Sequence, residues 1–233
     1  MIRLDKYLCD MNIGTRSEVK DIIRKMRVTV DGKVCKDSAT KVDDNSHVAL
    51  DGEELMYEEF RYYMLNKPAG VISATEDDRD KTVIDILEGE NTKGLFPVGR
   101  LDKDTEGLLL ITNDGDMSHR LLSPKKHVDK CYYVELAEPI DKDAIADLKE
   151  GVDIGDDELT LPAKVEAINP RAIYLTITEG RYHQVKRMMQ AVGNEVTYLK
   201  RVSFGPLELD KDLPLGAYRR LEADEIMMLQ IKC

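Results

Sequence analysis

Five acidic side chains lie close together in the segment GRLDKDTEGLLLITNDGD, residues 99–116. They are Asp102, Asp104, Glu106, Asp114 and Asp116. An ionised carboxylate of this kind can act as a nucleophile or as a general base. The Asn-Asp-Gly sequence around Asp114 predicts a turn, which explains that residue without chemistry. Because Glu106 lies near the start of an expected strand, the spacing leaves Asp102 and Asp104 as equal candidates.

A second segment with chemical potential is TEGRYHQVKRMMQAVG, residues 178–193. Its apolar residues recur at helical spacing up to a glycine that ends the helix: Val185, Met188, Met189, Val192 and then Gly193. Lys186 projects at the border of this stripe, where a cation could reach the floor of a cleft. His183 at the helix start could be an acid or a base, but a single histidine is more often structural.

The sequence contains none of the common cofactor or metal motifs. The glycine-rich dinucleotide and phosphate loops, the zinc-protease motif His-Glu-x-x-His and the serine-hydrolase motif Gly-x-Ser-x-Gly are absent. The cysteines are far apart and no histidine has zinc-ligand spacing, so we expect free thiols and no metal site. They are Cys9, Cys35, Cys131 and Cys233. Any chemistry is therefore expected to use side chains alone, without a small-molecule cofactor.

Length and charge restrict the class of protein. A chain of 233 residues with 42% hydrophobic residues can bury a core and is long enough for a medium domain and a small one. No apolar run is long enough to cross a bilayer, and charged residues interrupt the N-terminus MIRLDKYLCD, so we expect a cytoplasmic protein with no membrane partner. The net charge of −11 argues against indiscriminate coating of nucleic acid.

Positive charge is nevertheless concentrated in two places. One is the first thirty residues, and the other lies between Arg181 and Arg201. Basic patches in an acidic chain favour directed binding to a polyanion. The candidate contacts are Arg3, Lys6, Arg16, Lys20, Arg24 and Arg27 in the first cluster, with Arg181 and Arg187 in the second.

The N-terminal region predicts two short helices followed by small strands. Leu4, Tyr7, Leu8 and Met11 recur at helical spacing, and Gly14 is expected to end that helix. Thr15-Arg16-Ser17-Glu18 is a capping-box pattern that opens a second helix, with an apolar stripe of Val19, Ile22, Ile23 and Met26. Arg16, Lys20, Arg24 and Arg27 share an adjacent helix face. RVTVDGKVCKD and HVALDGEEL predict strands that meet at Asp-Gly turns.

The rest of the chain predicts a larger α+β domain. Strand-like runs such as YYMLNKP, GLLLIT, CYYVELA and AIYLTIT are interrupted irregularly by helical segments, which favours a mostly antiparallel sheet flanked by helices. LNKPAG at residues 65–70 is interpreted as a structural turn. MYEEF suggests a short linker, so we expect domains at residues 1–58 and 59–233.

Residues 1–56 resemble the RNA-binding module of ribosomal protein S4. The order of helix, Gly-Thr-Arg-Ser, helix and RVTVDGK carries the resemblance. It implies a domain that docks on structured RNA through phosphates and shape.

The segments NKPAG, GRLDKDTEGLLLITNDG, KCYYVEL, EGRYHQVKRMMQAVG and LKRVSFGPLEL together resemble the successive motifs of RsuA-family pseudouridine synthases. The resemblance implies that Asp102 is the essential acid, that Tyr132 stacks on the target base and that Lys186 pairs with the catalytic carboxylate. It also implies that Arg100 helps to fill the space left by a flipped nucleotide. Strand alternation in CYYVELA independently puts Tyr132 on the face opposite Tyr133. Related synthases have arginine at the position of Lys186, so a bidentate pair with Asp102 is not available here.

The resulting hypothesis is a monomeric isomerase that converts one uridine of small-subunit (16S) ribosomal RNA, in an assembling subunit, to pseudouridine. The GRYHQVKRM variant and the lack of a long basic C-terminal extension resemble the small-subunit enzymes. The alternatives are a large-subunit (23S) RNA target and a non-catalytic ribosome-assembly factor that binds RNA. The sequence leaves open which uridine is modified and whether Asp102 acts as nucleophile or base.

Overall fold

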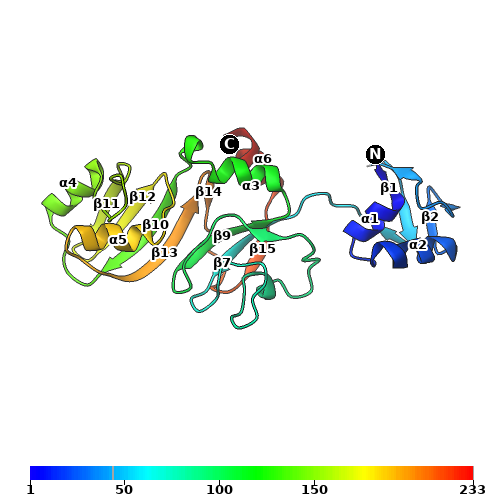
Figure 1. Cartoon of the computed structure of the whole chain (residues 1–233), viewed down its shortest axis with the longest axis horizontal. Helices are drawn as coiled ribbons and strands as arrows, with labels where there is room; N and C mark the ends of the chain where they lie inside the picture. The colour runs from blue at the N-terminus through cyan, green and yellow to red at the C-terminus, as the bar shows by residue number, and fades with distance from the viewer. Residues whose placement is uncertain (44, 233) are drawn as a thin grey trace. The chain divides into compact units, whose positions relative to one another are not determined.

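The computed structural model describes residues 1–43 and 45–232. The chain divides into two compact units, shown in Figure 1. The first unit comprises Met1–Arg61 with Gly89–Lys93, and the second comprises Tyr62–Glu88 with the chain from Gly94 onward. Residues 56–61 contain no helix or strand, and the boundary that we predict after residue 58 lies among them.

The first unit packs two helices against small antiparallel sheets. Its helices are α1 (Leu4–Asp10) and α2 (Arg16–Arg24). In the described residues, β1 (Ile2–Arg3) pairs with β4 (Lys41–Val42), and a four-stranded sheet has the order β3 (Lys33–Val34), β2 (Val28–Val30), β5 (Val48–Leu50), β6 (Glu53–Leu55). The predicted Asp-Gly turns join β2 to β3 and β5 to β6, and both residues of each turn have positive φ, as a tight hairpin requires.

The helix boundaries of this unit differ in part from the sequence prediction. The capping box of α2 is confirmed, because Thr15 accepts from the backbone of Glu18 while the Glu18 carboxylate accepts from the Thr15 N–H. The first helix ends before Gly14, since Asn12 already has φ 58°. The second ends at Arg24, and Met26, with φ 61°, is exposed rather than part of the apolar stripe. Arg27 therefore lies beyond the helix.

The second unit is built on one large sheet. Within the described residues it has nine strands in the order β11-β12-β10-β13-β9-β7-β15, with β14 added to β13 and β8 to β9. The strands are β7 (Tyr62–Lys67), β8 (Phe96–Pro97), β9 (Glu106–Thr112), β10 (Lys130–Leu136), β11 (Lys164–Asn169), β12 (Ala172–Ile177), β13 (Val196–Phe204), β14 (Leu207–Glu208) and β15 (Tyr218–Arg220). The predicted mixed, mostly antiparallel sheet is confirmed, since among these pairings only β13 with β9 is parallel.

Helices cover both faces of the central strands. They are α3 (Gly115–Leu122), α4 (Lys142–Glu150), α5 (Gln184–Ala191) and α6 (Ala223–Lys232), with short 3-10 turns at Ile84–Ile86 and Pro124–Lys126. Leu109 and Ile111 of β9 pack into the core formed with α4 and α5, whereas Leu108 and Leu110 pack with α3 and α6. This alternation follows from the two-residue period of a strand, and Figure 1 shows the two helix pairs around the sheet.

Two residues of the acidic segment have structural roles. Asp114 is not in a simple turn, because its carboxylate caps α3 by accepting from the Met117 N–H at 2.9 Å and also accepts from the Tyr62 hydroxyl at 2.7 Å. Gly107 lies where β9 meets β13, and a side chain there would collide with the backbone of Arg201. The segment after Thr105 is therefore scaffold for the loop that precedes it.

Candidate active site

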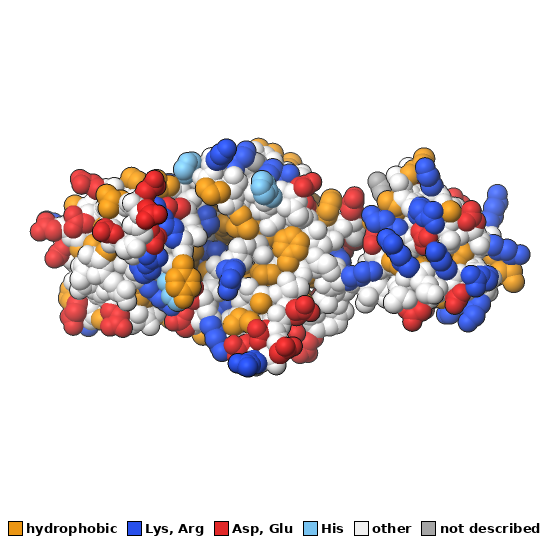
Figure 2. All heavy atoms as spheres, viewed as in Figure 1, with side chains coloured by type: hydrophobic (Ala, Val, Ile, Leu, Met, Phe, Trp, Pro, Cys, Tyr) orange, Lys and Arg blue, Asp and Glu red, His pale blue; other side chains and the backbone are white. Residues whose placement is uncertain are grey.

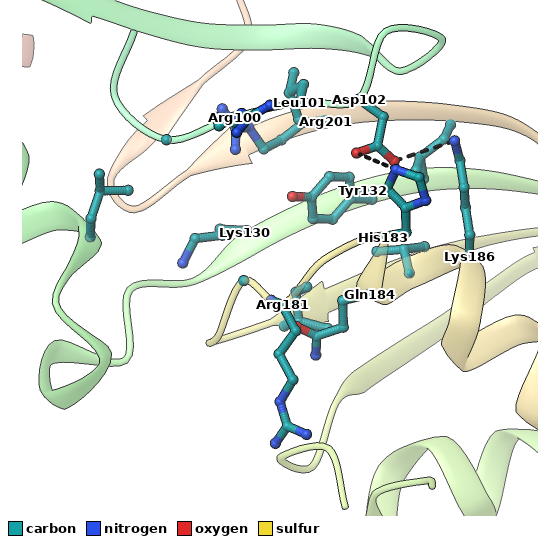
Figure 3. Close-up of a pocket in the computed structure, with 16 residues that line it drawn as sticks. Arg100, Leu101, Asp102, Lys130, Tyr132, Arg181, His183, Gln184, Lys186 and Arg201 are labelled. Carbon is teal, nitrogen blue, oxygen red and sulfur yellow. Dashed lines mark hydrogen bonds and ion pairs between the residues drawn. The ribbon is translucent and has the colours of Figure 1, made fainter. Parts of the chain in front are cut away.

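A cleft of about 130 Å³ opens in the second unit, where β10 and β13 meet the loop before β9 and the start of α5. Figure 3 shows its side chains converging from these four elements. Three residues that the resemblance assigns to catalysis, Asp102, Tyr132 and Lys186, all line this cleft although they are far apart in sequence.

Asp102 lies between two nitrogen groups from α5 and its approach. Its Oδ2 is 3.3 Å from the Lys186 Nζ, and its Oδ1 is 3.5 Å from the His183 Nε2. Both contacts are drawn in Figure 3. The Asp102 side chain is 26% exposed, which leaves it accessible to a ligand in the cleft.

Lys186 also pairs with the neighbouring acid, Asp104. Its Nζ is 2.6 Å and 2.8 Å from the two carboxylate oxygens of Asp104, closer than it is to Asp102. Asp104 is 71% exposed and does not line the cleft. The expected Asp102–Lys186 pair is thus present, but the same ammonium also holds Asp104 outside the cleft.

Electrostatic interactions within this cluster stabilise the charged forms of Lys186 and Asp104. The hydrogen bond from Lys186 holds the pKa of the Asp104 carboxyl below its usual range. Burial acts to lower the pKa of Lys186, but hydrogen bonds and charge interactions with Asp104 and Asp102 outweigh it and raise that pKa. Lys186 is therefore a permanent cation beside the Asp102 carboxylate.

The loop that carries Asp102 is held from behind by a buried lysine. Lys67 is fully buried at the end of β7, and its Nζ donates to the carbonyls of Thr105 at 2.9 Å, Pro68 at 3.0 Å and Asp102 at 3.1 Å. Burial lowers its pKa to about 8, against the opposing effect of nearby carboxylates. The sequence pattern predicts only a turn here, and the one local signal of this role is a lysine at the end of an apolar strand.

A serine holds the other end of the loop. The Ser73 hydroxyl donates to the Leu101 carbonyl at 2.8 Å and accepts from the Leu101 N–H at 3.0 Å. The Gly70 N–H donates to the Lys103 carbonyl at 2.7 Å. These bonds fix the backbone on both sides of Asp102, so the carboxylate is presented by a rigid loop.

Tyr132 forms part of the cleft wall. As predicted, it shares the inner face of β10 with Val134 and Leu136, while Tyr133 lies on the other face. Tyr132 is only 7% exposed, and Figure 3 shows its ring beside the Asp102 carboxylate. A flat aromatic surface in this position suits stacking on a nucleobase.

His183 has a closer relation to the site than its sequence context suggested. It precedes α5 in a left-handed conformation with φ 48°, which is uncommon for a residue other than glycine. Its ring stacks on the exposed ring of Tyr182, with 3.9 Å between centroids. The structure therefore brings His183 to Asp102, a contact that spacing alone did not reveal.

The predicted RNA contacts of the second basic cluster have different surroundings. Arg100 is exposed at the cleft. Arg181 also lines the cleft, but its guanidinium donates to Glu179 and to the carbonyls of Glu158 and Leu159. Arg187 donates to the Ile154 carbonyl and pairs with Asp156. Their contribution to RNA binding stays a prediction.

In the first unit, several predicted RNA contacts form ion pairs within the chain. Arg3 pairs with Asp5, Lys6 with Asp10, Arg24 with Asp21 and Arg27 with Asp51. Arg16 and Lys20 on α2 are exposed and have no ion pair within residues 1–43 and 45–232. Figure 2 shows lysine and arginine side chains crowding the visible face of this unit.

No metal or membrane feature emerges from the described part of the chain. It holds no group of three or more His, Cys, Asp or Glu residues arranged for a metal ion. None of its helices is both long and apolar enough to span a bilayer. Cys9, Cys35 and Cys131 are free, and Cys233, for which we also expect a free thiol, lies outside the described residues.

Comparisons with known proteins identify the domains of the chain. Family descriptions of the RNA pseudouridylate synthases and of the S4 domain match residues 61–191 and 2–48, respectively. The chain is 52% identical to an uncharacterized RNA pseudouridine synthase, YtzG, from Bacillus subtilis, over 98% of both chains. It is 44% identical to ribosomal small subunit pseudouridine synthase A from Vibrio cholerae, over 97% of this chain and 98% of that protein.

A solved structure gives the same result at the level of the fold. A crystal structure of a pseudouridylate synthase matches with a TM-score of 0.71 and 39% sequence identity, over 98% of this chain and 100% of the other. The catalytic-domain match covers more than half of the chain, and the relatives span nearly all of it. The chain therefore belongs to the RNA pseudouridylate synthase family, with an S4 domain at its N-terminus.

Proposed function

We propose that this protein isomerises a uridine of small-subunit ribosomal RNA to pseudouridine, with Asp102 as the reacting group and no cofactor. The observation that carries the proposal is the convergence of Asp102, Tyr132 and Lys186 in one cleft. The near full-length similarity to proteins named for the small subunit supports the choice of RNA. Nothing in the cleft favours a large-subunit target or a binding protein without activity.

The reaction needs few groups. The bond from uracil N1 to the ribose C1′ breaks, the uracil rotates, C5 joins C1′, and the proton on C5 is finally transferred to N1. Atoms and electrons balance without an oxidant or an energy source. One carboxylate can serve as a nucleophile or as a base that removes a sugar proton, and the cleft is compatible with either role.

The surroundings of Asp102 suit this chemistry. The Lys186 ammonium puts a fixed positive charge 3.3 Å from one of its oxygens. The Tyr132 ring offers a surface for the uracil, which must leave the RNA stack to reach the carboxylate. Arg100 lies at the cleft, where it can fill the space that the flipped nucleotide leaves.

The wider parts of the proposal concern the assembly. We infer that the S4 domain holds the RNA through Arg3, Lys6, Arg16, Lys20, Arg24 and Arg27, with Arg181 and Arg187 contributing near the cleft. We also propose that the protein acts as a monomer, in the cytoplasm, on an assembling small subunit.

The target is tested by parallel modification reactions. The protein is incubated with assembling small-subunit particles, naked small-subunit RNA and large-subunit RNA, and new pseudouridines are mapped by carbodiimide-stop primer extension. We expect a single new stop in the small-subunit RNA. Modification of large-subunit RNA alone would overturn the target.

The catalytic role is tested by two matched substitutions. Asp102→Asn keeps the shape of the side chain but removes its charge, so turnover should fall by about a thousandfold or more while RNA binding persists. Asp104→Asn removes the equivalent charge outside the cleft and should lower turnover by less than about tenfold. Retained turnover in Asp102→Asn, or the reverse order of the two variants, would contradict the assignment.

A further inference from the structure

Two cations in the cleft have no role in the reaction as described. Lys130 lies two residues before Tyr132 on β10, and Arg201 lies opposite Tyr132 in the pairing of β10 with β13. Alternate residues of a strand, and residues paired across strands, point to the same face, so both side chains line the cleft. In Figure 3 they lie on one side of the Tyr132 ring, with Asp102 and Lys186 on the other.

Neither cation donates a hydrogen bond to a carboxylate in the part of the chain that the structure describes. Arg201 is 2% exposed, its Nε donates to the Leu108 carbonyl at 2.8 Å, and its Nη2 is buried without a hydrogen-bond partner in the described structure. Lys130 is 8% exposed, and its Nζ donates to the Val128 carbonyl at 2.8 Å. No ion pair involves either residue within the described ranges, although buried charges in proteins are usually paired.

The two side chains are held in place by the core. The guanidinium of Arg201 lies 4.9 Å from the centre of the Phe204 ring, and the Lys130 ammonium lies 5.6 Å from it. Phe204 is fully buried, and Gly107 allows β9 to approach the backbone at Arg201. The cations therefore belong to a rigid wall and not to a mobile surface.

This arrangement carries an electrostatic cost. Burial, and next the charge of Arg201, lower the pKa of Lys130 to about 8. The Asp129 and Glu179 carboxylates oppose this shift but do not cancel it. Two buried like charges repel each other, and neither forms an ion pair in the described residues. An anion bound between them would offset this cost.

We propose that Lys130 and Arg201 form a binding site for a backbone phosphate of the RNA, next to the nucleotide whose base stacks on Tyr132. This inference rests on the proposed function, because it assumes that the cleft accepts a uridine. Uracil and ribose are neutral, so the phosphates are the anionic groups that RNA brings to the cleft. A guanidinium can bind two phosphate oxygens at once, and a lysine adds a point charge.

The role of such a site is to position the nucleotide. A phosphate fixed on one side of Tyr132 would hold the ribose between that anchor and Asp102 on the other side. Because a phosphate carries no base information, this contact would orient any nucleotide in the cleft and would not select uridine.

The test compares nucleosides with nucleotides as ligands of the full-length protein. The probes are uridine, uridine 5′-monophosphate and uridine 3′-monophosphate, and their affinities are measured by ligand-observed NMR at low salt. We expect one of the two nucleotides to bind at least about tenfold more tightly than uridine. Lys130→Gln should reduce this preference to less than about threefold, and Lys130→Arg should restore it.

Lys200→Gln is the matched control. Lys200 precedes Arg201 on β13 and pairs with Tyr133, so it lies on the opposite face of the sheet. Its removal should leave the phosphate preference intact. Arg201→Lys provides a second variant. It keeps the positive charge but loses the proposed bidentate contact with the phosphate, so it should weaken the preference for the nucleotide over uridine.

Three outcomes would overturn the site. The first is equal affinity of the wild-type protein for uridine and both nucleotides, and the second is no binding of any of them; neither comparison needs a variant. The third is a preference that survives in Lys130→Gln, with uridine affinity showing that the variant is folded. Failure of the proposed function would appear separately, as a lack of pseudouridine in the modification reactions.

Discussion

Asp102 and Asp104 share one ammonium group, yet their surroundings differ. The backbone between them turns, with the Thr105 N–H donating to the Asp102 carbonyl at 3.1 Å. This turn directs one carboxylate into the cleft and leaves the other 71% exposed. At the scale of single residues, position relative to the turn distinguishes the two candidates.

Lys67 is the residue on which this turn depends. We predict that Lys67→Met lowers the free energy of unfolding by about 2–4 kcal/mol, because the buried carbonyl of Thr105 and the partly buried carbonyl of Pro68 lose their donor. Chemical denaturation of the two proteins measures the difference. A loss below about 1 kcal/mol would contradict the role that we assign to this lysine.

The same lysine predicts a pH dependence of stability. Its folded-state pKa is lowered, mainly by burial, from 10.5 to about 8, so between these values the unfolded chain binds more protons than the folded one. The stabilisation from Lys67 is therefore fully present above pH 10.5 and is lost as the pH falls through 8. The stability difference between wild type and Lys67→Met should grow when the pH is raised from 7 to 9.5.

At the scale of elements, α2 combines a strong start with a basic surface. Its capping box satisfies the first N–H groups, and Val19 and Ile23 anchor its apolar face in the core. Arg16 and Lys20 are left exposed on another face, one turn apart. A helix fixed in this way can present cations to phosphates in a constant geometry.

The basic face of α2 predicts a change in the salt dependence of RNA binding. The double variant Arg16→Glu/Lys20→Glu should weaken binding to small-subunit RNA and reduce the slope of log affinity against log salt by about one to two. Filter binding over a range of salt concentrations measures it. The control is Lys142→Glu/Lys149→Glu on the exposed part of α4, which makes the same change in net charge. Equal slopes for the two double variants would count against the α2 surface.

At the scale of the whole molecule, each of the two units has its own hydrophobic core, and charge is distributed unevenly along the chain. Leu4, Leu8 and Ile23 belong to the core of the first unit, and none of them contributes to the two clusters of the catalytic unit. A net charge of −11 coexists with exposed cations in the first unit and buried cations in the cleft. Average charge thus says little about where an RNA would bind.

Because the two units have separate cores, we predict that a core substitution in one unit destabilises only that unit. Ile23→Ala should destabilise the first unit by about 2–5 kcal/mol through the cavity that it creates. Hydrogen exchange should then accelerate in α1, α2 and β2, while β7 and β9 keep their protection. Faster exchange in β9 as well would show that the two units unfold as one.

Much of the local structure follows from the sequence alone. The period of the apolar residues predicts the buried face of α5 and the inward side of Tyr132, and the Asp-Gly pairs predict the hairpins of the first unit. These features depend on neighbours within a few residues, so local pattern contains them. The choice of Asp102 over Asp104 needed the resemblance to a family, since their spacing is equivalent.

Other features depend on packing between distant segments. The contacts of Lys186 with both acids, of His183 with Asp102 and of Lys67 with the Asp102 and Thr105 carbonyls join residues that are 35 or more positions apart. The hydrogen bond from the Tyr62 hydroxyl to Asp114 also depends on the fold, as does the burial of Lys130 and Arg201 beside the Phe204 ring. The periodicity of apolar residues along the sequence specifies which face of a helix or strand is buried. It does not specify which other element arrives there, because that depends on how the side chains of the whole unit fill space.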